Sequence, residues 1–425
     1  MTTTKVPFKA WVVCLTAGLF FFFIFIQLNA FNSLAPYLLQ SFQINAAQMG
    51  QLSSYLCIGN MLLLFPAGML LDRFSPHKII LIALGVGVLA TYFFAITHGF
   101  WIAAICRLFI GFSAAFTLLG CIKLASRWFP PERMAFITGL MVTMAMLGGM
   151  VAQTPFTLLI DALGWRIASQ IDAFLGVLIW LLILLLVRDY PAESQEKIAD
   201  QHKQLSSIGF WRAFGRVIIY PQNWLGGLYT SLINLPVFLL GAIWGIMYLA
   251  QAHGFSRSQA SYIVSGLFIG LMFGSPFFGW LSDTMKRRRR PMIIGAVFCL
   301  LIILLIMYIP KLSFNLYIMT FFLLGFVSSS QVIGYPLVAE SNSPALTGTA
   351  VGLASILIMA GGLAQPIFGW LMDLHWQHIM INGQPVYALN DYHLAMLIIP
   401  IGFAVALLLT FLVRETYCRF DSRGE

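Results

Sequence analysis

Twelve long apolar runs determine what this chain can fold into. An α-helix needs about 20 apolar residues to cross the hydrocarbon core of a bilayer. A chain of 425 residues with 60% hydrophobic and only 9% charged residues is too apolar for a water-soluble domain. The hydropathy pattern therefore predicts an all-α integral membrane protein with twelve transmembrane helices. The predicted spans are residues 11–39, 50–71, 79–97, 101–125, 134–159, 167–187, 224–251, 260–281, 292–309, 314–338, 346–370 and 393–414.

One segment of the sequence occurs in four related copies. Ser275–Asp283 returns ninety residues later as Gln365–Asp373, and the looser copies Pro66–Asp72 and Pro155–Asp161 lie eighty-nine residues apart. Each copy sits near the end of an apolar run and finishes on an aspartate. The copies therefore predict one kind of helix end that is used four times, with a repeat unit of three spans.

The basic residues predict the orientation of the chain in the membrane. If the N-terminus is cytoplasmic, the outer loops hold only Arg166, Arg257 and Lys311, and Arg107 lies inside a span, so 20 of the 24 basic residues lie on the cytoplasmic side. The positive-inside rule favours this choice, with both termini cytoplasmic. The net charge of +9 then places residues 286–290 against anionic lipid head groups, and a nucleic-acid partner is unnecessary. We expect a bacterial inner membrane.

The sequence contains no arrangement that indicates covalent chemistry. His375, His378 and His393 lie in or beside the predicted outer loop 373–392, but they lack cysteines or clustered carboxylates, so we expect a solvated loop and no metal. The chain has no phosphate-binding glycine loop, and its spans hold no set of nucleophile, base and acid. We therefore expect no enzymatic activity, no cofactor and no ATP-driven transport.

Two motifs resemble the cytoplasmic signature of the major facilitator superfamily. Residues 68–78 contain a glycine, three further residues, an aspartate and basic residues, and residues 279–288 repeat this order 211 positions later. Ser75, Pro76 and Thr284 depart from the usual pattern. The resemblance covers essentially the whole chain. It implies two six-helix bundles, each of two three-helix repeats, which rock around a midplane site.

The resemblance also divides the chain and implies a conformational latch. We expect an N-terminal bundle over 1–187, a cytoplasmic linker over 188–223 with an interfacial helix near 210–216, and a C-terminal bundle with a cytoplasmic tail over 224–425, in a monomer. Contacts of the signature residues would close in one conformation and break in the other, although static capping of helix ends is the alternative. The predicted latch residues are Gly68, Asp72, Arg73, Gly279, Asp283 and Arg287.

Polar side chains share one face in the spans that the repeat makes equivalent, namely the first, fourth, seventh and tenth. In the first span Asn29, Asn32 and Tyr37 follow helical spacing. Polar groups that face lipid lose their water partners, so this face should look toward a wet cavity or toward other helices. The resemblance implies that these four spans line the central cavity. The predicted substrate-binding residues are Asn29, Asn32, Tyr37, Arg107, Asn234, Trp244, Tyr248, Gln331 and Tyr335, with Gln153 and Gln365 as further candidates.

Arg107 and Asp172 are the charged residues that stand out inside the predicted spans. Arg107 begins an Arg-x-x-x-Gly element similar to that of the family, and a charge inside a span indicates function. Each lies about 9 Å along its span from the outer end, at roughly 1.5 Å per residue. We expect an electrostatic link between the two, with Asp172 as a proton site. A purely structural pair is the alternative. Glu340 either caps the eleventh helix or latches the inner gate.

Together with these residues, the resemblance implies a secondary active transporter that moves a small polar metabolite by alternating access. We expect a symporter. Organic acids, amino acids and short peptides are the expected substrates, and Arg107 favours a solute that bears a carboxylate. Protons are the expected coupling ion. Two alternatives stay open: an exporter of drug-like or siderophore-like amphipathic compounds, and a membrane receptor that has the same fold but does not transport.

Overall fold

The computed structural model describes residues 7–129, 134–190, 215, 217–309, 312–342, 346–381 and 384–418. Within these residues, twelve helical spans are long and apolar enough to cross a membrane. The predicted all-α fold with twelve transmembrane helices is therefore confirmed. The predicted interfacial helix near 210–216 lies almost entirely outside the described residues and stays a prediction.

Nine helices form the first six spans. They are α1 (Phe8–Asn29), α2 (Phe31–Phe42), α3 (Ala46–Arg73), α4 (Pro76–Ile96), α5 (Phe100–Ala114), α6 (Thr117–Trp128), α7 (Met134–Val151), α8 (Thr154–Leu163) and α9 (Trp165–Leu186).

The second half of the chain forms the remaining six spans and one short hairpin. Its elements are α12 (Pro221–Ile233), η3 (Val237–Trp244), α13 (Gly245–His253), α14 (Arg257–Thr284), α15 (Arg289–Tyr308), α16 (Phe314–Ser328), η4 (Ser329–Ile333), α17 (Gly334–Glu340), α18 (Thr347–Ala360), η5 (Gly361–Leu363), α19 (Ala364–Asp373), β1 (Met380–Ile381), β2 (Gln384–Pro385), α20 (Leu389–Met396) and α21 (Ile398–Leu412).

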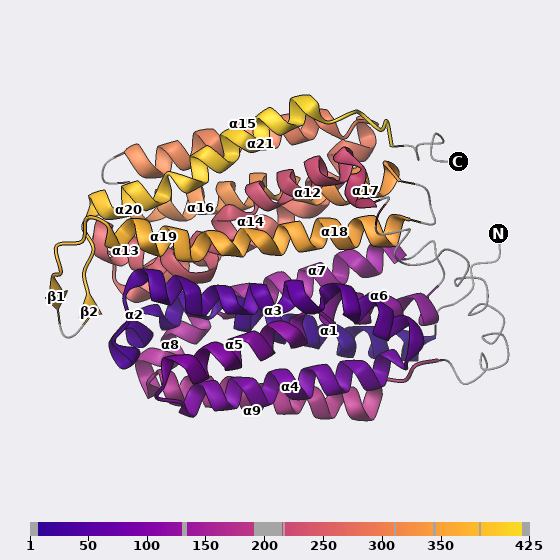
Figure 1. Cartoon of the computed structure of the whole chain (residues 1–425), viewed down its shortest axis with the longest axis horizontal. Coiled ribbons are helices and arrows are strands. Elements are labelled where there is room, and N and C mark those ends of the chain that lie inside the picture. Colours follow the sequence, from indigo (N-terminus) through magenta and orange to yellow (C-terminus); the bar gives the residue numbers. More distant parts are fainter. Residues whose placement is uncertain are drawn as a thin grey trace.

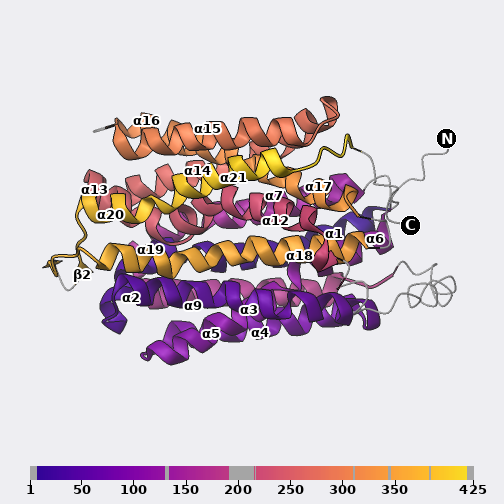
Figure 2. The same cartoon turned by 45° about the horizontal axis from the view of Figure 1, so that its top comes forward.

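The two halves of the chain form two bundles that lie side by side. In Figure 1 the helices of the first half occupy the lower part of the molecule and those of the second half the upper part. In Figure 2 α3, α4 and α5 still lie below α14, α15 and α16, whereas α7 of the first half lies among helices of the second half and contacts α14. Helix α1 begins and helix α21 ends at one end of the molecule, which we call the terminal end. The hairpin of β1 and β2 lies at the other end, which we call the opposite end.

The starts of α3 and α14 show how closely the halves repeat each other. The side chain of Asn45 accepts a hydrogen bond from the backbone N–H of Gln48, and the side chain of Ser256 accepts one from the backbone N–H of Gln259. In return, each glutamine side chain accepts a hydrogen bond from the backbone N–H of that asparagine or serine. Such capping boxes satisfy backbone N–H groups that the first turn of a helix leaves free. Both boxes lie at the opposite end, and they are 211 residues apart, as the two signatures are. The repeat read from sequence therefore extends to helix capping.

The four spans predicted to face the centre are interrupted, as are the fifth, eleventh and twelfth spans. The first span breaks at Ala30 between α1 and α2, the fourth breaks before α6, the seventh contains the π-helix η3, and the tenth contains the 3₁₀-helix η4. Interrupted helices leave backbone groups that need partners from neighbouring helices, and in transporters they mark binding regions. These interruptions therefore direct attention to the polar side chains that lie beside them.

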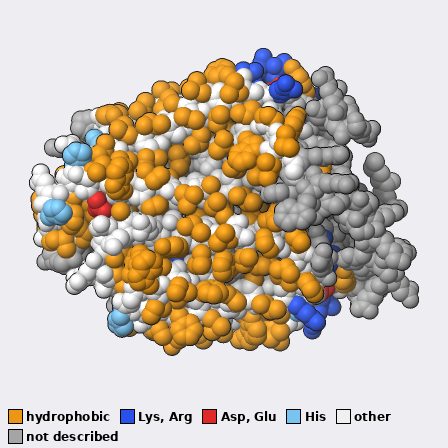
Figure 3. All heavy atoms as spheres, in the orientation of Figure 1, with side chains coloured by type: hydrophobic (Ala, Val, Ile, Leu, Met, Phe, Trp, Pro, Cys, Tyr) orange, Lys and Arg blue, Asp and Glu red, His pale blue; other side chains and the backbone are white. Residues whose placement is uncertain are grey.

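The outer surface of the helices is apolar. Hydrophobic side chains cover most of the described surface between the two ends (Figure 3), and Trp101, Leu185 and Leu412 are each more than 60% exposed. A surface of this kind is stable only against lipid. The chain is therefore a multi-pass membrane protein.

Candidate functional site

Arg107 on α5 lies inside the first bundle. It is only 1% exposed, its Nη1 donates a hydrogen bond of 2.8 Å to the carbonyl oxygen of Gln27, and its guanidinium lies 3.9 Å from the centre of the Phe31 ring. Its Nε and Nη2 atoms have no hydrogen-bond partner among the described residues. A buried cation with two free donor atoms is costly in a membrane. The contact with the aromatic face offsets only part of that cost.

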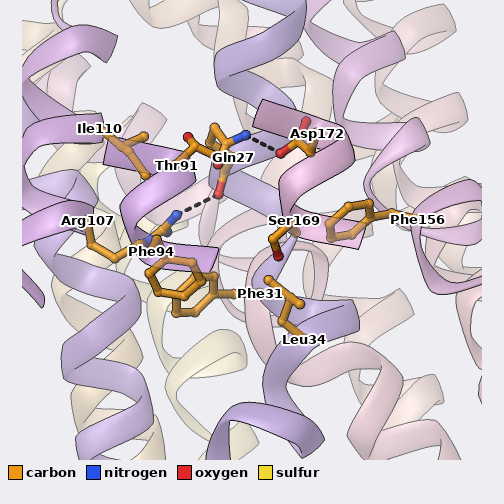
Figure 4. A pocket seen from close by; sticks show the side chains of 11 residues that line it. Gln27, Phe31, Leu34, Thr91, Phe94, Arg107, Ile110, Phe156, Ser169 and Asp172 are labelled. Atoms are coloured by element: carbon orange, nitrogen blue, oxygen red, sulfur yellow. Dashed lines mark hydrogen bonds between the residues drawn. The ribbon is translucent and has the colours of Figure 1, made fainter. Parts of the chain in front are cut away.

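Gln27 connects Arg107 to Asp172. Its backbone carbonyl oxygen accepts a hydrogen bond from Arg107, and its side-chain Nε2 donates one to a carboxylate oxygen of Asp172 on α9 (Figure 4). Asp172 is 6% exposed. No hydrogen bond or ion pair among the described residues joins Arg107 and Asp172 directly. The two charges are therefore connected through one residue, Gln27.

These residues line a small pocket. All of its lining residues belong to the first half of the chain, so it lies within the first bundle and not between the bundles. Thr91 and Ser169 add two hydroxyl groups to its wall, and Figure 4 shows Phe31 and Phe94 below Arg107. The pocket is lined by Gln27, Ala30, Phe31, Leu34, Thr91, Phe94, Arg107, Ile110, Phe156, Ser169 and Asp172.

Asn32 binds to the π-helix of the seventh span. Its Nδ2 donates to the carbonyl oxygens of Leu240 (2.7 Å) and Gly241 (2.9 Å), and its Oδ1 accepts from the backbone nitrogen of Ile246 (2.8 Å). Gln153 Nε2 donates to the same Gly241 oxygen at 2.9 Å. A π-helix presents carbonyls that an α-helix would satisfy internally, and such segments are frequent at functional sites. In this conformation Asn32 and Gln153 therefore hold the two halves together.

The other predicted substrate residues occupy separate places. Tyr37 lies at the opposite end, Asn29 donates to its own helix at Phe25, and Tyr248 donates to Ile306 inside the second bundle. The hydrogen bonds of the described residues join no two of the nine predicted side chains. Their roles as substrate ligands stay a prediction. Buried polar atoms without a hydrogen-bond partner among the described residues include Asn29 Oδ1, Asn234 Oδ1, Trp244 Nε1 and Gln365 Oε1.

At the opposite end, an ion pair joins the halves. Arg257, the first residue of α14, pairs with Asp161 on α8 at 2.5 Å and donates to the carbonyl oxygen of Ser33 at 2.8 Å. Tyr37 donates to Asp161 at 3.2 Å and also contacts Arg257. The side chains of Arg257 and Asp161 are 23% and 38% exposed. This cluster closes the opposite end on one side of the molecule.

Asp373 makes the equivalent contact on the other side. Its carboxylate accepts from the backbone nitrogens of Ala46 (3.3 Å) and Ala47 (2.9 Å), at the first turn of α3. The positive end of a helix dipole favours a carboxylate in this position. Ala46 and Arg257 each begin the second span of their bundle. The two aspartates therefore bind equivalent places, Asp161 through the Arg257 side chain and Asp373 through backbone N–H groups. Two of the four repeated aspartates, Asp161 and Asp373, therefore connect the two halves at the opposite end. The sequence singled out all four aspartates but did not predict this contact between the halves.

Close glycine contacts accompany these polar ones. A Cβ atom on Gly50 would clash with the backbone at Gln365, and one on Gly369 would clash with the backbone at Ala46. The signature glycines of the terminal end differ, because a Cβ on Gly68 or Gly279 would meet no atom within 4 Å. Among the described residues, the hydrogen bonds between halves all lie between the middle and the opposite end. The molecule is closed at that end in this conformation.

The predicted latch residues of the second half bind within their own bundle. Asp283 pairs with Arg288 at 2.7 Å, and Arg287 lies 5.7 Å from the Tyr417 ring. Glu340 pairs with the same Arg288 at 2.6 Å. Burial tends to lower the pKa of Arg288, but hydrogen bonds to Glu340 and Asp283 outweigh it and raise the pKa above its ordinary value. The side chains of Asp72 and Arg73 lie outside the described part of the chain.

Two acids that sequence reasoning did not use occupy matching places at the terminal end. Asp189, which follows the sixth span, accepts from Ser75, from the backbone nitrogen of His77 and from Arg127. Glu415, which follows the twelfth span, accepts from the backbone nitrogens of Arg288 (2.6 Å) and Arg289 (3.0 Å). Each acid therefore binds the start of the third span in its bundle. The sequence could have indicated these contacts, because one acid follows the last span of each bundle by a few residues.

Comparisons with known proteins agree with this architecture. The family model of the Major Facilitator Superfamily matches residues 17–366 and 228–419. The chain is 24% identical to a probable hexose phosphate transport protein of Chlamydia trachomatis and 24% identical to the membrane sensor protein UhpC of Salmonella typhimurium, each over 82% of both chains. A crystal structure of a bacterial homolog of the human lysosomal transporter Spinster matches with a TM-score of 0.79 at 18% identity, over 98% of this chain and 99% of that one.

These matches confirm the expected family. They support a secondary transporter of small metabolites, which is not an enzyme. They leave the substrate and the coupling ion to be proposed. The chain belongs to the Major Facilitator Superfamily.

Proposed function

We propose that the protein takes up a small organic anion by proton-coupled symport. The observation that carries this proposal is the chain of contacts from Arg107 through Gln27 to Asp172 in the first bundle. While Asp172 is ionised, the pocket holds one positive and one negative charge. Protonation of Asp172 removes the negative charge and leaves Arg107 uncompensated, which favours the arrival of an anion.

This arrangement links the proton and the anion thermodynamically. If protonation strengthens anion binding, anion binding must raise proton affinity by the same factor. Such positive coupling is what a symporter needs. The guanidinium is covered by Phe31 in this conformation, so access to its free Nε and Nη2 atoms requires the Phe31 ring to move. The break between α1 and α2 next to Phe31 provides a place where span one can bend.

The substrate class follows from charge. A phosphate or carboxylate group suits an arginine with free donor atoms, and the relative from Chlamydia trachomatis is named for hexose phosphate transport. Organic acids and sugar phosphates are therefore the first solutes to test, followed by amino acids and short peptides. By the positive-inside rule we place the terminal end in the cytoplasm of a bacterial inner membrane. The end that is closed in this conformation then faces the outside.

The test uses purified full-length protein in liposomes with an internal pH reporter. Hexose phosphates, phosphoglycerates, carboxylates, amino acids and dipeptides are added one class at a time. We expect internal acidification with one anionic class, and faster uptake as the external pH falls. The Arg107→Gln variant should abolish uptake and counterflow, whereas the exposed-charge control Lys9→Gln should retain both.

The Asp172→Asn variant separates coupling from binding. It should retain counterflow of labelled solute but lose the acidification and the accumulation driven by a proton gradient. Wild-type acidification in this variant would contradict the role of Asp172. Wild-type uptake without any acidification would contradict proton coupling altogether.

A second candidate function is a receptor that binds its solute without transporting it. The similarity to the membrane sensor protein UhpC favours this candidate. Absence of counterflow for every solute class, combined with a solute-dependent rise in melting temperature, would support the receptor.

A further inference from the structure

A basic groove at the terminal end lies apart from the pocket of Arg107 and Asp172, and it includes Arg287, one of the predicted latch residues. It is formed where α15 begins and where the chain leaves α21, and it is lined by Arg287, Arg289, Arg290, Ile293, Glu415 and Tyr417. In Figure 3 the corresponding group of blue side chains stands at the upper part of the terminal end, beside an apolar surface. The groove therefore lies where the head groups of a bilayer would meet the protein.

The charges in this groove are unbalanced. The neighbouring Arg288 is paired with Glu340 and Asp283, but the described residues provide no ion pair for Arg287, Arg289 or Arg290. Glu415 is the one acid in the lining, and it already accepts two backbone hydrogen bonds. The Nε atom of Arg289 is buried and has no hydrogen-bond partner among the described residues. The groove therefore has three guanidinium groups and an unsatisfied buried donor.

Aromatic side chains position two of these arginines. The guanidinium of Arg289 lies 5.6 Å from the centre of the Phe411 ring, and that of Arg287 lies 5.7 Å from the centre of the Tyr417 ring. Such contacts reduce the freedom that each side chain loses when it binds a ligand. Arginine presents paired N–H donors that match two oxygens of a phosphate. The groove is therefore suited to a phosphate group.

An apolar surface continues from the groove along the membrane-facing sides of α15 and α21. These helices lie side by side. Phe298 and Leu301 on α15 are 51% and 56% exposed, and Phe411 and Leu412 on α21 are 55% and 66% exposed. A ligand that bears a phosphate at one end and hydrocarbon chains at the other would meet both surfaces at once. We propose that this groove binds a phosphate-bearing anion, with the head group of an anionic phospholipid favoured by the adjoining apolar surface.

The test measures binding of phosphatidylglycerol to purified full-length protein by native mass spectrometry and by thermal shift. Phosphatidylcholine, which carries a phosphate but no net charge, is the comparison lipid. We expect wild type to retain phosphatidylglycerol in preference to phosphatidylcholine. The double variant Arg289→Gln/Arg290→Gln should bind phosphatidylglycerol about ten-fold more weakly, because each basic residue near a membrane surface contributes substantially to anion attraction.

The matched control is Lys9→Gln/Lys78→Gln, which removes two exposed charges at the same end but outside the groove. It should bind phosphatidylglycerol as wild type does, and size-exclusion profiles establish that both variants fold. Inorganic phosphate and glycerol phosphate are tested in parallel. Arginine-dependent stabilisation by these soluble anions, equal to that by lipid, would support the phosphate site with a soluble source. Equal retention of the two lipids by wild type, or equal phosphatidylglycerol binding by the double variant and the control, would overturn the proposal.

Discussion

At the scale of single residues, the ion pair between Arg257 and Asp161 offers a direct test of how the opposite end closes. Both side chains are partly exposed, so their interaction should contribute only about 0.5–1 kcal/mol to closure. We expect Asp161→Asn to shift the molecule modestly toward opening of the opposite end, which spin-label distance measurements would detect. The exchange Asp161→Arg/Arg257→Asp should restore part of the closure. Equal opening in the exchange and the single variant would contradict an attraction between the two charges.

The pair of Arg288 and Glu340 should behave differently because it is buried. Their side chains are only 8% and 10% exposed. Removing one partner leaves the other charge buried, which typically costs about 3–5 kcal/mol, whereas replacing both with apolar residues costs far less. We therefore expect Arg288→Met to lower the melting temperature strongly. The double variant Arg288→Met/Glu340→Met should recover much of that loss, and a double variant no more stable than the single one would argue against the pair.

At the scale of elements, closure depends on two helices that approach through glycine. A methyl group on Gly50 of α3 would press against the backbone at Gln365, which cannot rotate away. Overpacking of this kind costs about 1–3 kcal/mol. We expect Gly50→Ala to disfavour closure of the opposite end and to slow transport severalfold. Gly99→Ala is the control, because its Cβ would meet Ile102 at an ordinary 3.8 Å; equal slowing in both variants would contradict this explanation.

At the scale of the whole molecule, the two ends should open in alternation. Spin labels at Ala162→Cys and His375→Cys report on the opposite end, and labels at Lys78→Cys and Thr284→Cys report on the terminal end, in a background with Cys418→Ser. The other five cysteines are buried. Without solute, we expect a short distance between the two labels at the opposite end. When a transported solute is added, the distance between labels should increase at one end and decrease at the other. Changes of the same sign at both ends would contradict alternating access.

The sequence predicted the helices well because the membrane restricts them severely. A span must be apolar over about 20 residues and must satisfy its own backbone groups, so hydropathy alone places it. The repeat then predicted which spans are equivalent. It also singled out the four aspartates, and the matched contacts of Asp161 and Asp373 follow that repeat. The sequence did not indicate which aspartates bind in a given conformation, since each is equally suited to a helix start.

The tertiary structure decided how polar side chains far apart in the chain are matched. Sequence reasoning placed Arg107 and Asp172 at similar depth, but only the packing of α1 between their helices puts Gln27 between them. Similarly, Asn32 was expected to face a cavity, and its bonds to η3 depend on a π-helix that no residue pattern predicted. Hydropathy by itself determined the spans and their number, because the bilayer acts on each span separately. The arrangement in two bundles was expected only from the resemblance of the signature motifs. The contacts between spans were decided only in the folded molecule, because helix rotation and the conformational state choose which polar groups meet.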